Sequence, residues 1–384
     1  MNADLKADLA ALTDTVRRFT LERIVPNVDA WEKAGLVPRE LHREAAALGL
    51  LGLGYPEELG GTPAPYALRH AVSVTMARHS ASGGVMAALF SHNIGLPPVL
   101  RHDSAELQRE IIPPVLRGER IAALAITEPG CGSDVASLRT RARLDGAEWV
   151  IDGEKVFITS GMRADWITMA VRTGEAKGAS GISMIVVPGD AAGLSRTALD
   201  KMGWLASDTA HLRLDGVRVP ARLLVGEQGA GFKIVMSNFN GERLGMSALA
   251  LGFAQACFDE ALDWARQRQA FGGALIDKPV IRHKLVDMQM RIRSTEAWLA
   301  TVTQLADEGK LESDPDCVAQ VCMLKNHATQ AMQFCADQAV QILGGMGFMR
   351  GTRSERVYRE VKVMMIGGGA EEIMKELAAR QLGL

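Results

Sequence analysis

The sequence predicts an α+β protein in three parts: an N-terminal helical domain, a middle antiparallel β domain and a C-terminal four-helix bundle. Two observations support this. Apolar residues recur at helical spacing in the first third of the chain and again after Gly229, whereas residues 122–225 alternate with a period of two. The length of 384 residues allows two or three domains. We therefore expect domains at 1–121, 122–225 and 226–384.

Two apolar stripes predict helices in the outer domains. In the first, the residues fall three or four positions apart and end before Pro26: Leu5, Leu9, Leu12, Val16 and Phe19. The second predicts one long amphipathic helix: Val321, Leu324, Ala328, Met332, Ala336, Val340 and Leu343. Four long helices fit into the C-terminal part, which is the usual number for a bundle.

The middle region contains short apolar runs with turn signals between them. Two such runs flank Asp152-Gly153, which is a strong indication of a β-hairpin. Residues 166–171 and 182–187 predict two further strands, and alternation continues on both sides of Asp215-Gly216. Neither βαβ alternation nor a Gly-x-Gly-x-x-Gly segment after a strand is present, so we exclude a doubly wound nucleotide fold.

Composition limits the partners that we expect. The net charge is −2 with both signs mixed along the chain, which argues against nucleic acid as the main partner. No run of eighteen apolar residues is present, so we expect no membrane span. The five cysteines form no Cys-x-x-Cys pair, which argues against a zinc site or a disulfide framework. The N-terminus lacks the apolar core of a signal peptide, and we expect a cytoplasmic protein with no metal.

Glycine is concentrated in two segments that ordinary turns do not explain. One is Thr127-Glu128-Pro129-Gly130-Cys131-Gly132-Ser133-Asp134, and the other has three consecutive glycines, residues 367–369. Glycine lacks a Cβ, so such segments allow backbone amides to approach a bound group closely. We expect Glu128, beside a proline, to hold the amides of its own loop.

Together with Gly153–Gly161, these segments closely resemble the acyl-CoA dehydrogenase family of flavoproteins. The resemblance extends from about residue 10 to the C-terminus. It implies FAD as the cofactor and the α,β-dehydrogenation of an acyl-CoA thioester to the trans-2-enoyl-CoA. It also implies that electrons pass to an electron-transferring flavoprotein and that the protein is a homo-oligomer, by family habit a tetramer.

The resemblance implies one group of cofactor contacts in the middle domain. The backbone around Ile126 and the Thr127 hydroxyl would bond the pyrimidine edge of the flavin. Phe157 would pack against the ring, where many relatives have tryptophan, and Thr159 would reach towards the flavin N5. The group as a whole is Leu124, Ile126, Thr127, Gly132, Ser133, Phe157, Ile158 and Thr159.

A second group of implied contacts lies in the C-terminal domain. The arginine of Arg268-Gln-Ala-Phe-Gly would bind the FAD pyrophosphate across a subunit interface, since its guanidinium fork suits a diphosphate. The segment Gln341-Ile-Leu-Gly-Gly would hold the ADP part of a neighbouring subunit's cofactor. Pro279 and Ala370 each replace a polar residue of the family, which predicts weaker flavin affinity. The second group is Arg268, Phe271, Gln341, Gly344, Gly345, Ala370 and Glu372.

The resemblance places the catalytic base at Glu242. Many relatives carry a glutamate at the position that is Gly368 here. A minority branch, which includes isovaleryl-CoA and long-chain dehydrogenases, carries the base in a Glu-Arg-Leu triplet, as in Glu242-Arg243-Leu244. Burial beside the acyl chain is expected to raise the pKa of Glu242. The alternative is an exposed Glu242 that pairs with a nearby arginine.

The substrate contacts that the resemblance implies surround this base. The Gly368 amide would bond the thioester oxygen, while Gly367 leaves space that favours a branched or bulky acyl group, or a medium or long chain. The implied contacts are Ser133, Asn240, Arg243, Gly367, Gly368 and Gly369. Two alternatives stay open: a flavin-dependent oxidase or monooxygenase on the same scaffold, and a catalytically silent CoA-binding protein.

Overall fold

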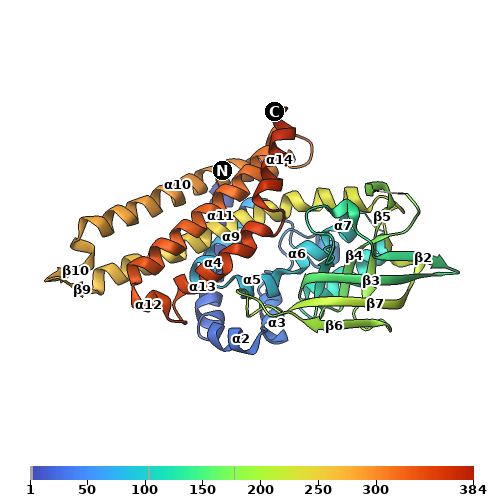
Figure 1. Ribbon diagram of the computed structural model, residues 1–384, viewed down its shortest axis with the longest axis horizontal. Helices are drawn as coiled ribbons and strands as arrows, with labels where there is room; N and C mark the ends of the chain where they lie inside the picture. Colours follow the sequence, from blue (N-terminus) through green and yellow to red (C-terminus); the bar gives the residue numbers. More distant parts are fainter. Residues whose placement is uncertain (1–2, 103, 177) are drawn as a thin grey trace.

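The computed structural model describes residues 3–102, 104–176 and 178–384 and has three consecutive parts. Figure 1 shows a sheet at one end of the molecule and long C-terminal helices that extend to the other end. The order of helices, sheet and helices confirms the predicted α+β class. Among the described residues, no helix is both long and apolar enough to cross a bilayer.

The N-terminal part consists of helices. The first confirms the predicted stripe, because it ends at Phe19 and buries Val16 and Phe19. A short π-helical segment, Thr20–Ile24, follows it. The helices are α1 (Ala3–Phe19), α2 (Val28–Ala34), α3 (Arg39–Ala47), α4 (Tyr66–Ser80), α5 (Gly83–Phe90), α6 (His92–Gly95), α7 (Pro97–His102) and α8 (Ala105–Leu116).

The middle part is one twisted sheet with the order β6-β7-β3-β2-β4-β5-β8, in which β1 also pairs with β4. Most neighbours are antiparallel, as predicted, but β1 and β2 each pair with β4 in parallel. The chain between β1 and β4 is long enough for the crossover that a parallel pair needs. The strands are β1 (Ala122–Ala125), β2 (Arg141–Asp145), β3 (Glu148–Thr159), β4 (Trp166–Arg172), β5 (Ile182–Pro188), β6 (Leu194–Ala198), β7 (Thr209–Pro220) and β8 (Leu224–Val225).

The predicted hairpin at Asp152-Gly153 is wrong. This pair lies inside the continuous strand β3, where the register with β7 shifts by one residue and forms a bulge. The Asp152 carboxylate accepts the Gly216 amide at 2.7 Å, so the two Asp-Gly pairs face each other across the bulge. Gly153 has φ of +141°, and a Cβ there would lie 2.7 Å from the Cα of Thr140. The actual hairpin joins β2 to β3 at Gly146.

The C-terminal part contains three long helices and three shorter ones. The predicted amphipathic helix over 321–343 is confirmed as part of α11. The segment between α13 and α14, residues 367–369, is called the triglycine loop below. The elements are α9 (Gly231–Gln267), β9 (Gln269–Ala270), β10 (Gly273–Ala274), α10 (Pro279–Asp307), α11 (Pro315–Leu343), α12 (Gly345–Phe348), α13 (Arg353–Ile366) and α14 (Glu371–Leu382).

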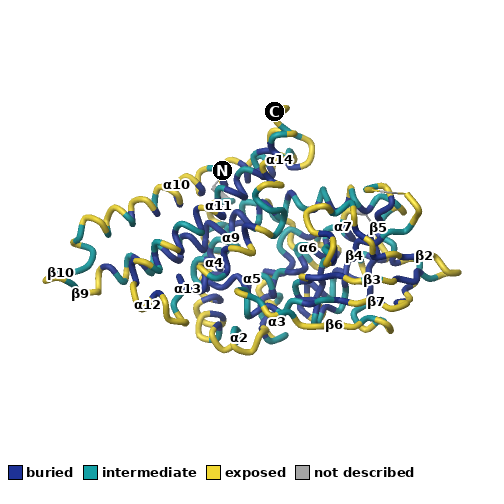
Figure 2. Tube along the Cα trace, in the orientation of Figure 1, coloured by how far each residue is buried: buried dark blue, intermediate teal, exposed yellow. Residues whose placement is uncertain are grey.

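Helix α9 passes through two hydrophobic cores. Its first turns contribute Ile234 and Val235 to the core of the sheet, whereas residues from Leu244 onward belong to the core of the helices. Figure 2 shows buried residues in both regions and many exposed residues along α10 and the β9–β10 hairpin. Glu242 therefore lies where the sheet and the helical bundle meet.

Candidate active site

The loop after β1 is held by a buried ion pair. The Lys155 ammonium donates to Glu128 Oε1 at 2.8 Å and to the Ile126 carbonyl at 2.9 Å. The Glu128 carboxylate also accepts the backbone amides of Arg139 and Thr140, at 2.6 and 2.9 Å. Burial disfavours the ionised carboxylate, but the Lys155 charge and these hydrogen bonds outweigh it and lower the pKa of Glu128. Glu128 is therefore structural, as expected, but the amides that its carboxylate holds are those of Arg139 and Thr140 and not those of its own loop.

Phe157 stands uncovered near the end of β3. Its φ is +62°, which is rare for a bulky residue, and its side chain is 69% exposed. The adjacent Val156 amide donates to the Thr127 carbonyl at 2.8 Å, which brings the strand and the Thr127 loop together. A large aromatic ring left uncovered on an unusual backbone suits contact with a flat apolar group.

Glu242 lies in α9 opposite the triglycine loop. The residue is half-buried, but its Oε2 is enclosed and has no hydrogen-bond partner among the described residues. Burial raises the pKa of Glu242 to about 7, although the positive charges of Arg243 and Lys325 act in the opposite direction. A Cβ placed on Gly368 would lie 3.9 Å from Glu242 Oε1. The carboxylate thus reaches the point where a side chain of residue 368 would begin.

The triglycine loop is fixed from two sides by buried cations. Gly368 and Gly369 have φ of +65° and +114°, a region that favours glycine. From α9, Arg243 Nε donates to the Gly368 carbonyl at 2.9 Å. From α11, Lys325 Nζ donates to the carbonyls of Met365 and Gly369 at 2.9 and 2.7 Å.

Met246 covers the same loop one helical turn after Glu242. Its Sδ lies 2.9 Å from the place of a Cβ on Gly368, and its Cε lies 3.8 Å from the place of one on Gly367. The space that we expected beside Gly367 is therefore partly filled by this side chain. A methionine is flexible enough to change its rotamer, so the space is adjustable.

The remaining predicted substrate contacts differ in their surroundings. Asn240 is buried, with its amide donating to the Leu311 carbonyl at 3.2 Å and its oxygen accepting from Arg243 at 3.1 Å. The polar groups of Asn240 are thus already bonded within the chain. Ser133 lies exposed in the loop after β1, beside the exposed Gly132.

Arg268 and Phe271 flank β9, which lies at the end of the molecule opposite the sheet (Figure 1). Both are exposed, and the Phe271 side chain is 94% accessible. Arg268 follows Glu242 by 26 positions, nearly all of them in α9. At 1.5 Å per helical residue, the two are separated by about 39 Å. One chain therefore does not bring Arg268 to Glu242.

The other residues of the second group divide between two places. Gln341, Gly344 and Gly345 lie where α11 ends and α12 begins, towards the same end of the molecule as Arg268 (Figure 1). Ala370 and Glu372 instead lie at the start of α14, next to the triglycine loop. Only these last two are near the loop within one chain.

Sequence reasoning did not single out Lys325 or Met246. The lysine lies on the buried face of α11, four positions after Val321 and three before Ala328. A lysine within an apolar stripe is a usable signal, because a buried ammonium requires hydrogen-bond acceptors. Nothing in the sequence distinguishes Met246 from the other core methionines.

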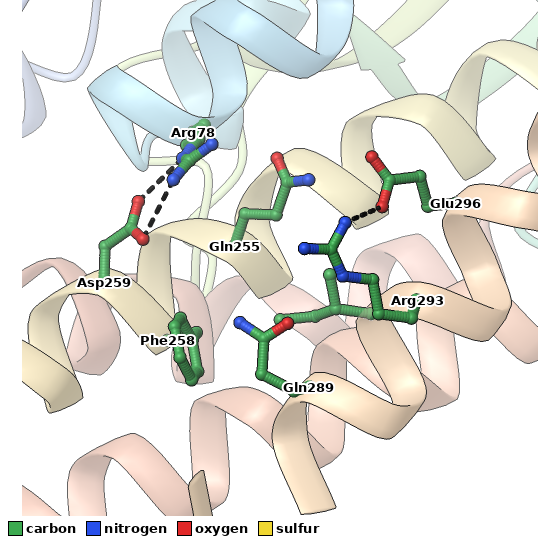
Figure 3. A pocket seen from close by; sticks show the side chains of 8 residues that line it. Arg78, Gln255, Phe258, Asp259, Gln289, Arg293 and Glu296 are labelled. Atoms are coloured by element: carbon green, nitrogen blue, oxygen red, sulfur yellow. Dashed lines mark hydrogen bonds and ion pairs between the residues drawn. The ribbon is translucent and has the colours of Figure 1, made fainter. Parts of the chain in front are cut away.

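A separate cleft of about 150 Å³ lies between α4, α9 and α10 (Figure 3). Two ion pairs line it, Arg78 with Asp259 and Arg293 with Glu296. Gln255, also in its lining, follows Glu242 by 13 positions in α9, which corresponds to about 20 Å. Because its charges are paired and it lies away from Glu242, we assign this cleft no part in the chemistry.

Comparison with known proteins assigns the family. The sequence profiles of the acyl-CoA dehydrogenase N-terminal, middle and C-terminal domains match residues 6–119, 123–217 and 229–383. The mitochondrial long-chain specific acyl-CoA dehydrogenase of Rattus norvegicus is 37% identical over 96% of this chain and 85% of the rat protein. The chain belongs to the acyl-CoA dehydrogenase family.

Further relatives of this acyl-CoA dehydrogenase agree. The cyclohexane-1-carbonyl-CoA dehydrogenase of Geobacter metallireducens is 34% identical over 98% of this chain and 97% of its own length. A solved structure from Mycobacterium smegmatis, assigned to the acyl-CoA dehydrogenases, has a TM-score of 0.95 and 43% identity, covering 100% of this chain and 98% of the other. The resemblance seen in the sequence is confirmed, and the protein is a flavoprotein oxidoreductase with FAD as its cofactor.

The residues present fit FAD. The uncovered Phe157 suits the face of the flavin ring, and it lies beside the loop that contains Thr127. The exposed Arg268 guanidinium, next to the exposed Phe271, suits a diphosphate and an adjoining flat group. Residues suited to each half of such a site are present in the chain, but Arg268 is about 39 Å from Glu242 along α9 of the same chain.

The raised pKa of Glu242 predicts that this carboxylate reduces stability at neutral and alkaline pH. A carboxyl group whose folded pKa is about 7, against 4.5 when unfolded, stabilises the folded state less as pH rises through that interval. Glu242→Gln should therefore raise the free energy of unfolding by about 1–3 kcal/mol at pH 8. Urea unfolding at pH 4.5 should show a much smaller difference, and an equal gain at both pH values would contradict the burial argument.

Proposed function

We propose that this acyl-CoA dehydrogenase converts an acyl-CoA thioester to the trans-2-enoyl-CoA with Glu242 as the base that removes the Cα proton. One observation carries the assignment: the enclosed Glu242 Oε2 lacks a hydrogen-bond partner among the described residues, while Oε1 lies beside the backbone of Gly368. An uncompensated carboxylate in such surroundings has a pKa suited to proton removal near neutral pH.

The triglycine loop would orient the substrate against this base. With its carbonyls bonded by Arg243 and Lys325, the loop is held so that the Gly368 amide remains available to the thioester oxygen. An amide in that role stabilises the negative charge that develops as the Cα proton leaves. Bound FAD would supply the acceptor for the hydride from Cβ.

We propose that Ile126, Thr127, Phe157 and Thr159 hold the flavin ring, and that a second copy of the chain completes the FAD site. The separation of about 39 Å between Glu242 and Arg268 supports this, since one FAD held beside Glu242 would not also reach Arg268 of the same chain. In a homo-oligomer, Arg268 and Gln341 would serve the neighbouring cofactor. A tetramer is our proposal for the assembly.

The proposal extends to the electron acceptor and the acyl group. The family resemblance supports an electron-transferring flavoprotein as the electron acceptor. The sequence supports a cytoplasmic location. The relatives are named for long-chain and cyclohexane-1-carbonyl substrates, which supports a medium, long or branched acyl group. The adjustable Met246 beside Gly367 is compatible with either, because the thioether can move away from a bulky Cα substituent.

Anaerobic titration with isovaleryl-CoA, octanoyl-CoA and palmitoyl-CoA tests this function. We expect the flavin absorbance to bleach with at least one of them, and the bleaching rate to rise with pH and level off above about 7, because Glu242 must be ionised. Absence of bleaching with all three would favour the silent CoA-binding protein. Rapid return of the colour in air would favour an oxidase.

A further inference from the structure

A buried lysine without a carboxylate partner supports the triglycine loop. The Lys325 side chain is fully buried, and among the described ion pairs none includes it. Its Nζ instead donates to the backbone carbonyls of Met365 and Gly369. Burying an ammonium group without a counter-ion is costly, so a lysine retained here requires an explanation beyond packing.

One acceptor carbonyl lies just before the loop and the other at its last residue. That of Met365 is in the last turn of α13, where unpaired carbonyls carry partial negative charge and favour a cation. That of Gly369 lies two positions before α14 begins at Glu371. The next residue of α11, Asn326, donates to the Glu371 carbonyl at 2.9 Å. Helix α11 thus fixes both ends of the loop.

The middle of the loop is fixed by the helix that carries the base. Arg243, directly after Glu242, bonds the Gly368 carbonyl at 2.9 Å. Two cations, one from α9 and one from α11, therefore hold two carbonyls of the loop and the Met365 carbonyl just before it. If Lys325 were absent, the Arg243 contact alone would have to hold a segment of three glycines, which has high conformational freedom.

We propose that Lys325 is a positioning residue for dehydrogenation: by bonding both flanks of the triglycine loop, it fixes the Gly368 amide relative to the Glu242 carboxylate. The inference rests on the proposed role of Glu242. It assigns Lys325 no contact with the substrate or FAD. A purely structural tether between α13 and α14 is the alternative.

The charge of Lys325 separates these two roles. The titratable or charged groups around Glu242 and the loop come from several elements: Arg243 of α9, Cys322 and Lys325 of α11, and Glu371 of α14. Tyr66 of α4 lies beside Gly241, and Lys362 Nζ of α13 lies 3.5 Å from Met365 Sδ. Arg243 and Lys325 both lower the pKa of Glu242, against the stronger effect of burial. Burial lowers the pKa of Lys325 to about 8, so the ammonium is still mostly charged at pH 7.

Two readouts test the proposal in the FAD-loaded protein: the pH dependence of anaerobic flavin reduction, and the hydrogen exchange of amides 366–370. For Lys325→Met we expect a reduction rate at pH 7 lower by about tenfold or more, because a small misplacement of reacting groups is costly. The apparent pKa should rise by about one unit, since a positive neighbour is lost. Exchange of the loop amides should become faster.

Matched variants keep the test decisive. Lys33→Met makes the same substitution at an exposed lysine of α2 and should change neither readout. Lys325→Gln keeps one donor but removes the charge; it should raise the apparent pKa even if the methionine variant does not fold. Unchanged pKa and exchange in a folded Lys325 variant would overturn the proposal. If Glu242→Gln stays inactive in that case, the base assignment stands; if Glu242→Gln is fully active, both inferences fall.

Discussion

Replacing Glu242 by glutamine should lower the rate of flavin reduction by an acyl-CoA about 10²–10⁴-fold, because general-base catalysis contributes on this scale. Glutamine keeps the size and polarity of the side chain but does not accept a proton. Binding of the thioester should change little, since the triglycine loop is bonded by Arg243 and Lys325 rather than by Glu242. Anaerobic stopped-flow absorbance with the best acyl-CoA of the panel measures the rate, and isothermal titration with the enoyl-CoA product measures binding.

A matched variant gives the control for this experiment. Glu227 is exposed and lies four positions before α9 begins, so Glu227→Gln should reduce its flavin at the wild-type rate. A rate for Glu242→Gln within about threefold of wild type would reject Glu242 as the base. A loss of product binding together with the rate would instead indicate a disturbed loop.

The geometry explains why the base is carried by α9 rather than by the triglycine loop. Gly368 has φ of +65°, which is unfavourable for a residue with a side chain, and Met246 Sδ lies 2.9 Å from the place of its Cβ. A glutamate at 368 would have to displace Met246 and would meet the Glu242 carboxylate. Methionine at 246, glycine at 368 and glutamate at 242 are therefore mutually compatible, and changing one of them alone disturbs the others.

Local sequence patterns predicted much of the fold because they reflect local physics. The stripes that end at Phe19 and Leu343 follow helical periodicity, and both became helices. The hairpin prediction at Asp152-Gly153 was wrong because the same dipeptide suits a turn or a bulge, and only the pairing of β3 with β7 decides between the two. The parallel pairing of β1 with β4 was missed because it depends on a long-range crossover.

The candidate site was predictable where a motif lies in one segment and less so where segments meet. Glu242 and Gly368 were linked before the structure only through the family resemblance, and the structure places Glu242 Oε1 3.9 Å from the position that a Cβ of residue 368 would take. The bonds of Lys325 span 40 and 44 positions of the chain, so no local pattern contains them. The place of Arg268 relative to a flavin depends on a second copy of the chain.

Replacing Lys155 by methionine should destabilise the protein by about 3–5 kcal/mol, because removing one partner of a buried ion pair leaves the other charge uncompensated. The Lys155 side chain is fully buried, and its Nζ bonds both Glu128 and the Ile126 carbonyl. The two backbone amides that Glu128 also accepts offset part of the loss. Urea unfolding at pH 7 measures the change, and FAD content should fall with it because the pair holds the Thr127 loop.

The double variant Lys155→Met/Glu128→Gln tests the cause of this loss. With no charge left to compensate, it should recover more than half of the stability that Lys155→Met loses. The exposed pair of Lys310 and Glu308 is the control, and Lys310→Met should leave the free energy of unfolding close to that of the wild type. The pKa of Glu128 is lowered in the folded protein, so the stability it contributes is present above its unfolded pKa of 4.5 and is lost as pH falls. The difference in the free energy of unfolding between wild type and Lys155→Met should therefore become smaller in acid. If this difference is constant from pH 7 to pH 4, Lys155 contributes packing rather than charge.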